Sequence, residues 1–254
     1  MRIPKTHPRY KSLLIRERIV EGFRKGLVVP EGLIAHGRGE AFDYILGEKS
    51  WDFAVKAEEA TVAWLLTARR PVISVNGNYA ALAAREIGEL VKYTGAIVEV
   101  NLFYRTEERV RRIVDFLRYN GVERVMDPQC DRETIPGLES PRSIVCREGI
   151  WKADFVLLAM EDGDRTEAIK RMGKIVSAID LNPFSRTAQT ADITIVDEAI
   201  RATRNMINMA RSMAYMHRSD LDRIKENYDN TEILKSAFRA ILLRLDDASR
   251  KGVL

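Results

Sequence analysis

The chain has 254 residues, 46% of them apolar and 31% charged, which is enough for a sizeable buried core. Its net charge of +4 is concentrated at the start, because residues 1–30 contain eight Lys or Arg residues and two acids. We expect no membrane partner, since no apolar run is long enough to span a bilayer and the polar, basic first residues do not resemble a signal peptide. We also expect no nucleic-acid partner, because the basic arm lacks interleaved aromatic residues, whereas small phosphorylated ligands suit it.

The cysteines and histidines indicate neither a metal site nor a redox motif. Cys130 and Cys146 are the only cysteines, and their spacing fits no zinc or redox pattern, so we expect reduced thiols in a cytoplasmic protein. His7, His36 and His217 are scattered, and no two of them lie at metal-ligand spacing. The abundance of Glu, Lys and Arg favours a heat-adapted source.

The first part of the chain is predicted to be helical. Residues 10–25 form one helix, and residues 28–39, which contain one proline and three glycines, follow it as a loop. Two further helices are expected at 40–46 and 51–68, with Ser50 as the N-cap of the second.

From residue 71 onward, short apolar strands alternate with helices. This alternation predicts βαβ units and therefore an α/β fold with a Rossmann-like, mostly parallel sheet flanked by helices. We expect strands at 71–75, 96–103, 154–160, 174–180 and 192–197, a short strand at 123–126, and helices at 79–93, 106–119 and 164–172. Residues 127–143 are expected to be loop, and Asp164 to cap the last of these helices.

We expect the whole chain, residues 1–254, to form a single α/β domain. A helical N-terminal segment (1–70) precedes the Rossmann-like core (71–197), and C-terminal helices (198–254) follow it.

Parallel sheets bind ligands beyond the carboxyl ends of their strands, so the segments that follow the strands are the places to look for a site. Four polar segments qualify: Asn76–Tyr79, Asn101–Arg105, Glu161–Asp164 and Asp180–Asp192. The first has one glycine instead of the GxGxxG pattern of dinucleotide sites, which favours an ordinary turn over a phosphate loop. The third could hold Mg²⁺ through its carboxylates, although Asp-Gly is also an ordinary turn sequence.

Two arginines of the N-terminal segment are candidates for anion binding. Arg16 lies among the apolar residues of one helix face, which are Leu13, Val20 and Phe23. Its guanidinium would be buried and would need an anionic ligand or a structural carboxylate, unless it snorkels to the surface. Arg38 lies between two glycines before a predicted helix, which suits either close approach of a ligand or a flexible surface loop.

The stretch from Ile179 to Val196 is the strongest candidate. It begins and ends as apolar strand, but polar side chains fill its middle, among them Asp180, Asn182, Arg186 and Thr187. Acceptors, an amide and a cation together can bind a ribose, a base edge and a phosphate. The stretch therefore predicts a ligand site rather than a purely structural loop.

Methionines recur every three or four residues near the start of the C-terminal segment. They are Met206, Met209, Met213 and Met216. Such a stripe suits either the core or a subunit interface, and the second possibility favours a symmetric homodimer.

The polar stretch also carries a family resemblance. The run DLNPFSRTA (180–188), followed by ADITIVDEAIRA (191–202), resembles the signature region of the archaeal phosphopantothenate synthetases, which are 4-phosphopantoate–β-alanine ligases. The N-terminal run from His7 to Glu48 and the central SVNGNYAAL (74–82) resemble the same family. The resemblance extends over nearly the whole chain to about residue 217.

The resemblance implies an ATP-dependent, AMP-forming ligase of coenzyme A biosynthesis. It would condense 4-phosphopantoate with β-alanine to 4′-phosphopantothenate through an acyl-adenylate, with Mg²⁺ present and release of pyrophosphate. The implied roles are Arg16 and Arg38 at the ATP phosphates and in catalysis, Asp180, Leu181 and Asn182 in the nucleotide pocket, Arg186 and Thr187 near the phosphates, and Glu198 and Ala199 at the pocket end. Lys5, Arg9 and Arg105 are candidates for the phosphate of 4-phosphopantoate.

Two other classes of protein share such a fold. A nicotinamide-dependent oxidoreductase is disfavoured by the missing GxGxxG after the first sheet strand. A non-catalytic nucleotide-binding regulator would bind ATP without releasing pyrophosphate.

Overall fold

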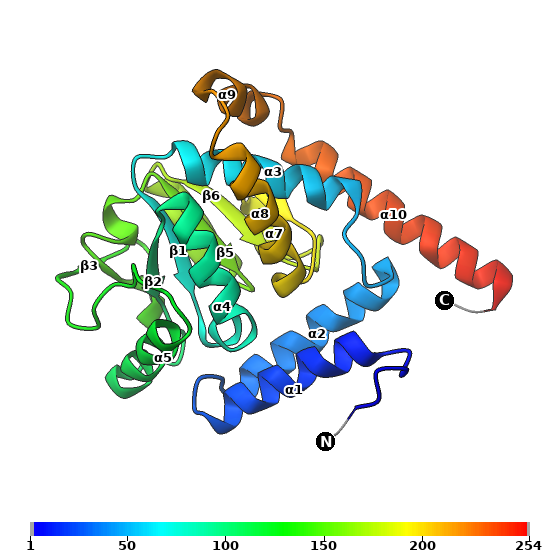
Figure 1. Ribbon diagram of the computed structural model, residues 1–254, viewed down its shortest axis with the longest axis horizontal. Helices are drawn as coiled ribbons and strands as arrows, with labels where there is room; N and C mark the ends of the chain where they lie inside the picture. Colours follow the sequence, from blue (N-terminus) through cyan, green and yellow to red (C-terminus); the bar gives the residue numbers. More distant parts are fainter. Residues whose placement is uncertain (1–2, 253–254) are drawn as a thin grey trace.

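The computed structural model describes residues 3–252 and has a five-stranded parallel sheet at its centre (Figure 1). The strands are β1 (Pro71–Val75), β2 (Ile97–Val100), β5 (Phe155–Ala159), β6 (Ile175–Ile179) and β7 (Ile193–Ile195), in the spatial order β2-β1-β5-β6-β7. The predicted α/β fold with a Rossmann-like sheet is confirmed, and each strand lies within the range predicted for it. The ends of the predicted domain, residues 1–2 and 253–254, lie outside the described residues.

The sheet is covered on both faces because its strands are apolar on both sides. In β5, Phe155 and Leu157 belong to one hydrophobic cluster, whereas Val156 and Leu158 belong to a second, as the two-residue period of a strand requires. The first cluster contains residues of α3 (Asp52–Thr67), α4 (Gly77–Thr94), α5 (Glu107–Tyr119) and α8 (Ala199–Met213). The second contains residues of α6 (Gly163–Arg171) and of the short helix η2 (Ile150–Lys152).

Helices α1 (Tyr10–Arg24) and α2 (Pro30–Leu46) lie side by side at one end of the sheet, in blue in Figure 1. The loop predicted at 28–39 is wrong, because α2 begins at Pro30 and contains all three glycines. At Gly32 a side chain would clash with Asn78 of α4, whose amide donates a hydrogen bond to the Gly32 carbonyl (2.8 Å). Glycine lowers the intrinsic stability of a helix. At Gly32 it also permits close packing against α4, which stabilises α2.

Two predicted helix caps are wrong. The N-cap of α3 is Trp51, and the hydroxyl of Ser50 instead donates to the carboxylate of Asp197 (2.5 Å). Helix α6 begins at Gly163, one residue earlier than predicted, with Asp162 as its N-cap. In both places a polar side chain that suits a cap in sequence lies outside the cap position or has a partner elsewhere.

The segment between α5 and β5 contains a small hairpin that the sequence did not reveal. Strands β3 (Arg132–Thr134) and β4 (Ile144–Cys146) pair antiparallel; β3 lies in the loop predicted at 127–143, and no element was predicted for β4. The strand predicted at 123–126 is reduced to a single bridge between Val125 and Val98. Arg132 lies opposite Cys146, which brings Cys130 close enough to form a disulfide with Cys146, their Cα atoms 5.7 Å apart. The expected reduced thiols are therefore wrong, because the hairpin and not the sequence spacing determines the pairing.

The C-terminal segment is helical, as predicted, in α8, α9 (Arg218–Glu226) and α10 (Asn230–Lys251). Helix α8 packs against α3 and α4, which buries Met206 and Met213 within the chain. Two of the four methionines of the stripe are thus core, whereas Met209 is partly buried and Met216 is exposed. Helix α10, in red in Figure 1, projects away from the sheet. Among residues 3–252, no helix is both long and apolar enough to cross a bilayer.

Candidate active site

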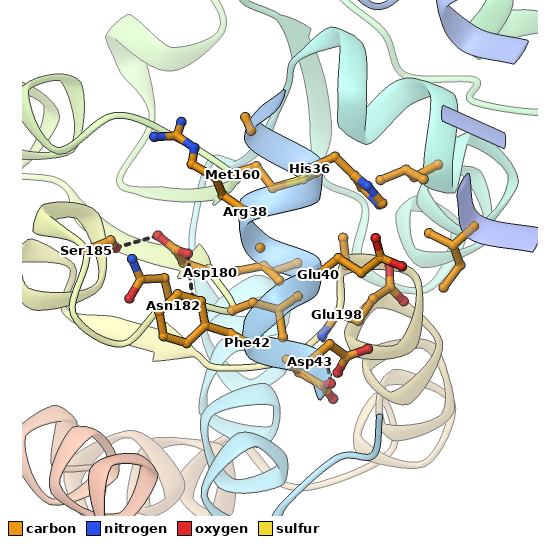
Figure 2. A pocket seen from close by; sticks show the side chains of 18 of the residues that line it. His36, Arg38, Glu40, Phe42, Asp43, Met160, Asp180, Asn182, Ser185 and Glu198 are labelled. Atoms are coloured by element: carbon orange, nitrogen blue, oxygen red, sulfur yellow. Dashed lines mark hydrogen bonds between the residues drawn. The ribbon is translucent and has the colours of Figure 1, made fainter. Parts of the chain in front are cut away.

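A cavity of about 260 Å³ lies between α2 and the carboxyl ends of β5, β6 and β7 (Figure 2). Its volume is near the lower end of the ~300–1,000 Å³ that small-molecule sites occupy. Of the four segments expected to border the crevice, those after β5 and β6 do so, and those after β1 and β2 do not. The lining residues are Ser12, Ile15, Ala35, His36, Arg38, Gly39, Glu40, Phe42, Asp43, Leu82, Met160, Glu161, Asp162, Ile179, Asp180, Leu181, Asn182, Ser185, Asp197, Glu198 and Ala199.

The segment after β1 is a helix start that the chain itself covers. The side-chain oxygen of Asn76 accepts a hydrogen bond from the N–H of Tyr79 (3.0 Å), so Asn76 is the N-cap of α4. A Cβ at Gly77 would clash with the carbonyl oxygen of Leu27, in the connection between α1 and α2. This close contact favours the structural interpretation of Asn76–Tyr79, because a phosphate would need the same space.

The polar residues after β6 bond mainly to one another. The Asp180 carboxylate accepts hydrogen bonds from the N–H of Asn182 (2.9 Å) and from the hydroxyl of Ser185 (2.5 Å). The side-chain oxygen of Asn182 accepts from the N–H of Phe184 (2.9 Å). Burial raises the pKa of Asp180, and these two hydrogen bonds oppose the rise. Asp180, Leu181 and Asn182 all line the cavity, but much of their polarity holds a tight turn together.

The turn ends in a short helix, α7 (Arg186–Thr190), which was not predicted. Ser185 caps it, accepting a hydrogen bond from the N–H of Ala188 (2.9 Å). Arg186 is exposed and pairs with Glu167 (2.5 Å), and the hydroxyl of Thr187 donates to the backbone carbonyl of Glu161 (2.6 Å). Neither Arg186 nor Thr187 lines the cavity.

The end of the cavity near β7 is formed by the start of α8. Glu198 is the N-cap of this helix and accepts hydrogen bonds from the N–H groups of Ile200 (3.0 Å) and Arg201 (2.9 Å). Burial raises the pKa of Glu198, and the same hydrogen bonds lower it. Glu198 and Ala199 both line the cavity, at a helix start as predicted.

Arg16 is not in the buried stripe that the sequence suggested. The buried residues of α1 are Ser12, Ile19 and Gly22, and a Cβ at Gly22 would come within about 2.5 Å of the Cβ of Ala81 on α4. This close contact sets the rotation of the helix, so the Arg16 side chain is 42% exposed. Its Nε donates to the carboxylate of Glu40 (2.9 Å).

Arg38 lies within α2 and not in a glycine loop before a helix. It is exposed and lines the cavity. Within residues 3–252 its guanidinium forms no ion pair and no hydrogen bond, which leaves all its donors available to a ligand. Arg16 and Arg38 therefore differ, since one is paired with a carboxylate and the other is not.

Four carboxylates gather at the cavity in a group that we call the acidic lobe, and of these the sequence predicted only Glu198 as a site residue. Its members are Glu40, Asp43, Asp197 and Glu198. Arg201 pairs with Asp43 (2.7 Å) and with Asp197, and Glu40 is only 12% exposed. The helical spacing of His36, Glu40 and Asp43 could have revealed one wall, but the loop predicted at 28–39 concealed it.

A buried ion network supports the cavity wall after β5. The Glu161 carboxylate lies between two arginines: Arg165, which is completely buried and donates to it at 2.5 Å, and Arg142 of the short helix η1 (Pro141–Ser143). Arg142 also pairs with Asp162 (2.8 Å). Because unpaired buried charges are strongly destabilising, this network fixes the position of Glu161.

The candidates for a second phosphate site are not brought together at the cavity. Lys5, Arg9 and Arg105 do not line it, and Arg105 lies beyond β2 with Glu107 as its partner (3.5 Å). The described part of the chain has no cluster of three or more His, Cys, Asp or Glu side chains placed to hold a metal ion. Mg²⁺ bound here would therefore take most of its ligands from water and from substrate oxygens.

Comparison with known proteins gives consistent results over nearly the whole chain. A family model described as phosphopantothenate/pantothenate synthetase matches residues 53–244. The chain is 51% identical over 251 residues to a protein of Thermococcus kodakarensis, which covers 99% of this chain and 96% of that protein. It is 47% identical over 239 residues to a protein of Methanosarcina mazei, covering 94% of each. Both relatives are named 4-phosphopantoate–β-alanine ligase.

Proposed function

The chain belongs to the phosphopantothenate/pantothenate synthetase family, and from this premise we propose that it joins 4-phosphopantoate to β-alanine at the expense of ATP. The product would be 4′-phosphopantothenate, an intermediate of coenzyme A biosynthesis. The observation that supports this most directly is the cavity beyond β5, β6 and β7, where parallel sheets bind nucleotides and where Asp180, Leu181 and Asn182 line one wall.

The proposed reaction proceeds in two steps. A carboxylate is a poor acyl donor, so an oxygen of the 4-phosphopantoate carboxylate first attacks the α-phosphorus of ATP and pyrophosphate leaves. The β-alanine amine then attacks the acyl carbon, and AMP leaves with the electron pair of the broken C–O bond. Neither step needs a covalent nucleophile from the protein, because positioning and electrostatic stabilisation suffice.

We propose the following roles at the nucleotide. Arg38, with its free donors, contacts the ATP phosphates, and Arg16 joins it by exchanging Glu40 for a phosphate oxygen. Asp180, Leu181 and Asn182 hold the ribose and base, with Glu198 and Ala199 at the far end. Arg186 and Thr187 lie behind this wall and reach the phosphates only if α7 moves.

We propose that Mg²⁺ enters with ATP. It keeps several waters and needs only one or two carboxylates, and the half-exposed carboxylate of Asp162 on the cavity wall can supply one. There the ion would neutralise charge on the phosphates. We also assign the enzyme to the cytoplasm, since intracellular proteins of hyperthermophilic archaea do carry disulfides such as Cys130–Cys146.

We further propose a symmetric homodimer whose interface is formed by α10 and not by the methionine stripe. The projecting helix α10 exposes Leu242, Leu243 and Leu245, and Leu243 is 68% exposed. Exposed apolar clusters of this kind mark protein interfaces. Light scattering should give about twice the chain mass of 29.0 kDa, and Leu243→Glu should lower it. A wild-type protein that remains monomeric at micromolar concentration would contradict this proposal.

The function is tested by following both products of ATP. Purified protein should release pyrophosphate only when ATP and 4-phosphopantoate are both present, and should form 4′-phosphopantothenate and AMP when β-alanine is added. Release of ADP and phosphate would instead show that the carboxylate is activated as an acyl phosphate and not as an adenylate. ATP binding without any turnover would instead favour a non-catalytic regulator, and hydride transfer from a nicotinamide would favour an oxidoreductase.

A further inference from the structure

Helix α2 presents different chemistry on its two sides within the cavity. Figure 2 shows Arg38 on the side of Asp180, Asn182 and Ser185, whereas His36 and Glu40 extend to the opposite side of the helix. His36 and Glu40 are four residues apart, so their side chains lie one above the other on the same helix face. The second side of α2 therefore combines an imidazole with the acidic lobe.

The acidic lobe attracts cations. It contributes four carboxylates to the cavity, and three arginines bond to them: Arg9 (3.5 Å) and Arg16 (2.9 Å) to Glu40, and Arg201 to Asp43 and Asp197. Carboxylates outnumber their close cations, so the field in this lobe favours a positively charged ligand group such as an ammonium.

His36 is suited to accept a proton. Its ring lines the cavity and has no hydrogen-bond partner within residues 3–252, so its basic nitrogen is available. Burial lowers the pKa of His36, and Arg16 on α1 lowers it further, while Glu40 on the same helix opposes both. Leu82, the residue of α4 that lines the cavity, is uncharged. The imidazole is consequently neutral at pH 7 and can act as a base.

We propose that His36 is the general base that removes a proton from the ammonium group of the amino-acid substrate, which the acidic lobe binds. This inference rests on the proposed ligase function and assigns its second step. One N–H bond of the ammonium breaks and its proton moves to His36, which frees the nitrogen lone pair. The nitrogen then bonds to the acyl carbon, and AMP leaves with the electrons of the C–O bond. The second proton that the nitrogen loses passes to the departing AMP phosphate.

The other histidines provide a matched control. His7 accepts a hydrogen bond from the N–H of Arg9 (3.0 Å), and His217 precedes α9 on the surface. Neither lines the cavity. His36→Asn should therefore affect the proposed step, and His217→Asn should not affect any step.

The decisive experiment separates the two half-reactions at pH 7. The first is exchange of labelled pyrophosphate into ATP with 4-phosphopantoate, and the second is amide formation with β-alanine. In His36→Asn we expect exchange to stay within about threefold of wild type and amide formation to fall about 100-fold or more, the usual effect of a general base. Hydroxylamine is already unprotonated at pH 7, so His36→Asn should form the acyl hydroxamate at nearly the wild-type rate.

The pH dependence gives a second readout, and its first part is measured on the wild-type protein alone. In wild type, amide formation should be flat at neutral pH and fall as His36 becomes protonated below its ordinary pKa of about 6.5. Hydroxamate formation, expressed per unprotonated hydroxylamine present at each pH, should not fall with it. In His36→Asn, amide formation should instead rise about tenfold per pH unit from pH 7 to 9, as the free amine does.

Three results would overturn the assignment. Unchanged amide formation in His36→Asn would show that His36 has no role, and an equal loss of exchange and amide formation would make it a contact of ATP or of the scaffold. Parallel pH profiles in wild type for β-alanine and for the unprotonated fraction of hydroxylamine would also show that His36 is not the base. Failure of the ligase function itself looks different, because wild type would then show no pyrophosphate exchange.

Discussion

Two walls of the cavity satisfy their polar groups in different ways. On the wall after β6, Asp180, Asn182 and Ser185 bond to one another or to nearby backbone. On the wall formed by α2, the side chains of His36 and Arg38 line the cavity and have no hydrogen-bond partner in the described chain. A dense run of polar residues in the sequence thus marks a self-supporting turn, while the side chains with unused bonding capacity come from a helix that looked like a loop.

The ion network that supports the cavity wall after β5 can be broken at Glu161. Replacing it in Glu161→Ala leaves the completely buried Arg165 without its carboxylate, so we expect the free energy of unfolding to fall by ~3–5 kcal/mol. Urea denaturation measures this loss. The control Glu167→Ala removes exposed pairs with Arg171 and Arg186 and should cost less than ~1 kcal/mol. Equal losses in the two variants would mean that the buried network carries no special weight.

The wall formed by α2, whose side chains lack partners, is tested at Arg38. Arg38→Met removes a charge that the protein does not use, so stability should change by less than ~0.5 kcal/mol. ATP affinity should fall about 10- to 150-fold, the effect of losing one charge-assisted contact worth ~1.5–3 kcal/mol. Calorimetric titration with ATP measures the affinity, and Arg24→Met, on the exposed side of α1, is the control. If both variants bind ATP like wild type, Arg38 is not a ligand contact.

The charge of the acidic lobe can also be tested through Glu58, which interacts with Asp197. Burial, and secondarily the neighbouring Asp197, raise the pKa of Glu58 to about 9. The unfolded chain releases this proton near pH 4.5, so the stabilising contribution is complete below that pH and is lost as pH rises towards 9.

Glu58→Gln should remove this loss of stability at high pH, because the amide of Gln can donate a hydrogen bond where the protonated acid does. We expect the variant to be clearly more stable than wild type at pH 8 and nearly to match it at pH 5. Thermal denaturation at the two pH values checks this, with the exposed Glu59→Gln as control. A constant difference between Glu58→Gln and wild type at both pH values would show that Glu58 is ionised in the folded protein.

The smallest effects are expected at Arg16, the paired arginine at this end of the cavity. Because its side chain is 42% exposed, Arg16→Met should change stability by no more than ~1 kcal/mol. ATP affinity should fall only about 3- to 10-fold, since Arg16 must leave Glu40 before it can bind a phosphate. Denaturation and ATP titration on the same preparation measure both quantities. An unchanged affinity would restrict Arg16 to orienting Glu40.

The strands and their crevice were predictable because their signal is local. Runs such as Pro71–Val75 and Phe155–Ala159 are short, apolar and buried along their whole length, and such runs form parallel strands wherever both faces of a sheet are covered. The rule that ligands bind beyond the carboxyl ends of these strands then led to Asp180 and Glu161 without knowledge of the fold.

The parts that could not be predicted depend on distant contacts. In the sequence, Gly32 disfavours a helix. In the structure, its contact with Asn78 stabilises α2. The rotation of α1, and with it the exposure of Arg16, depends on the contact of Gly22 with Ala81. Both contacts connect segments about fifty residues apart, which no periodicity in the sequence records.

The disulfide has a practical consequence for anyone who handles this protein. Cys130 and Cys146 are separated by 16 positions, and a cross-link that closes a ring of this size contributes ~3 kcal/mol by restricting the unfolded chain. A preparation in which this bond is reduced and one in which it is intact are thus chemically distinct samples, and we expect them to have different melting temperatures. Storage buffers, crystallisation trials and heat-inactivation curves can be compared between laboratories only when the oxidation state of this single bond is stated.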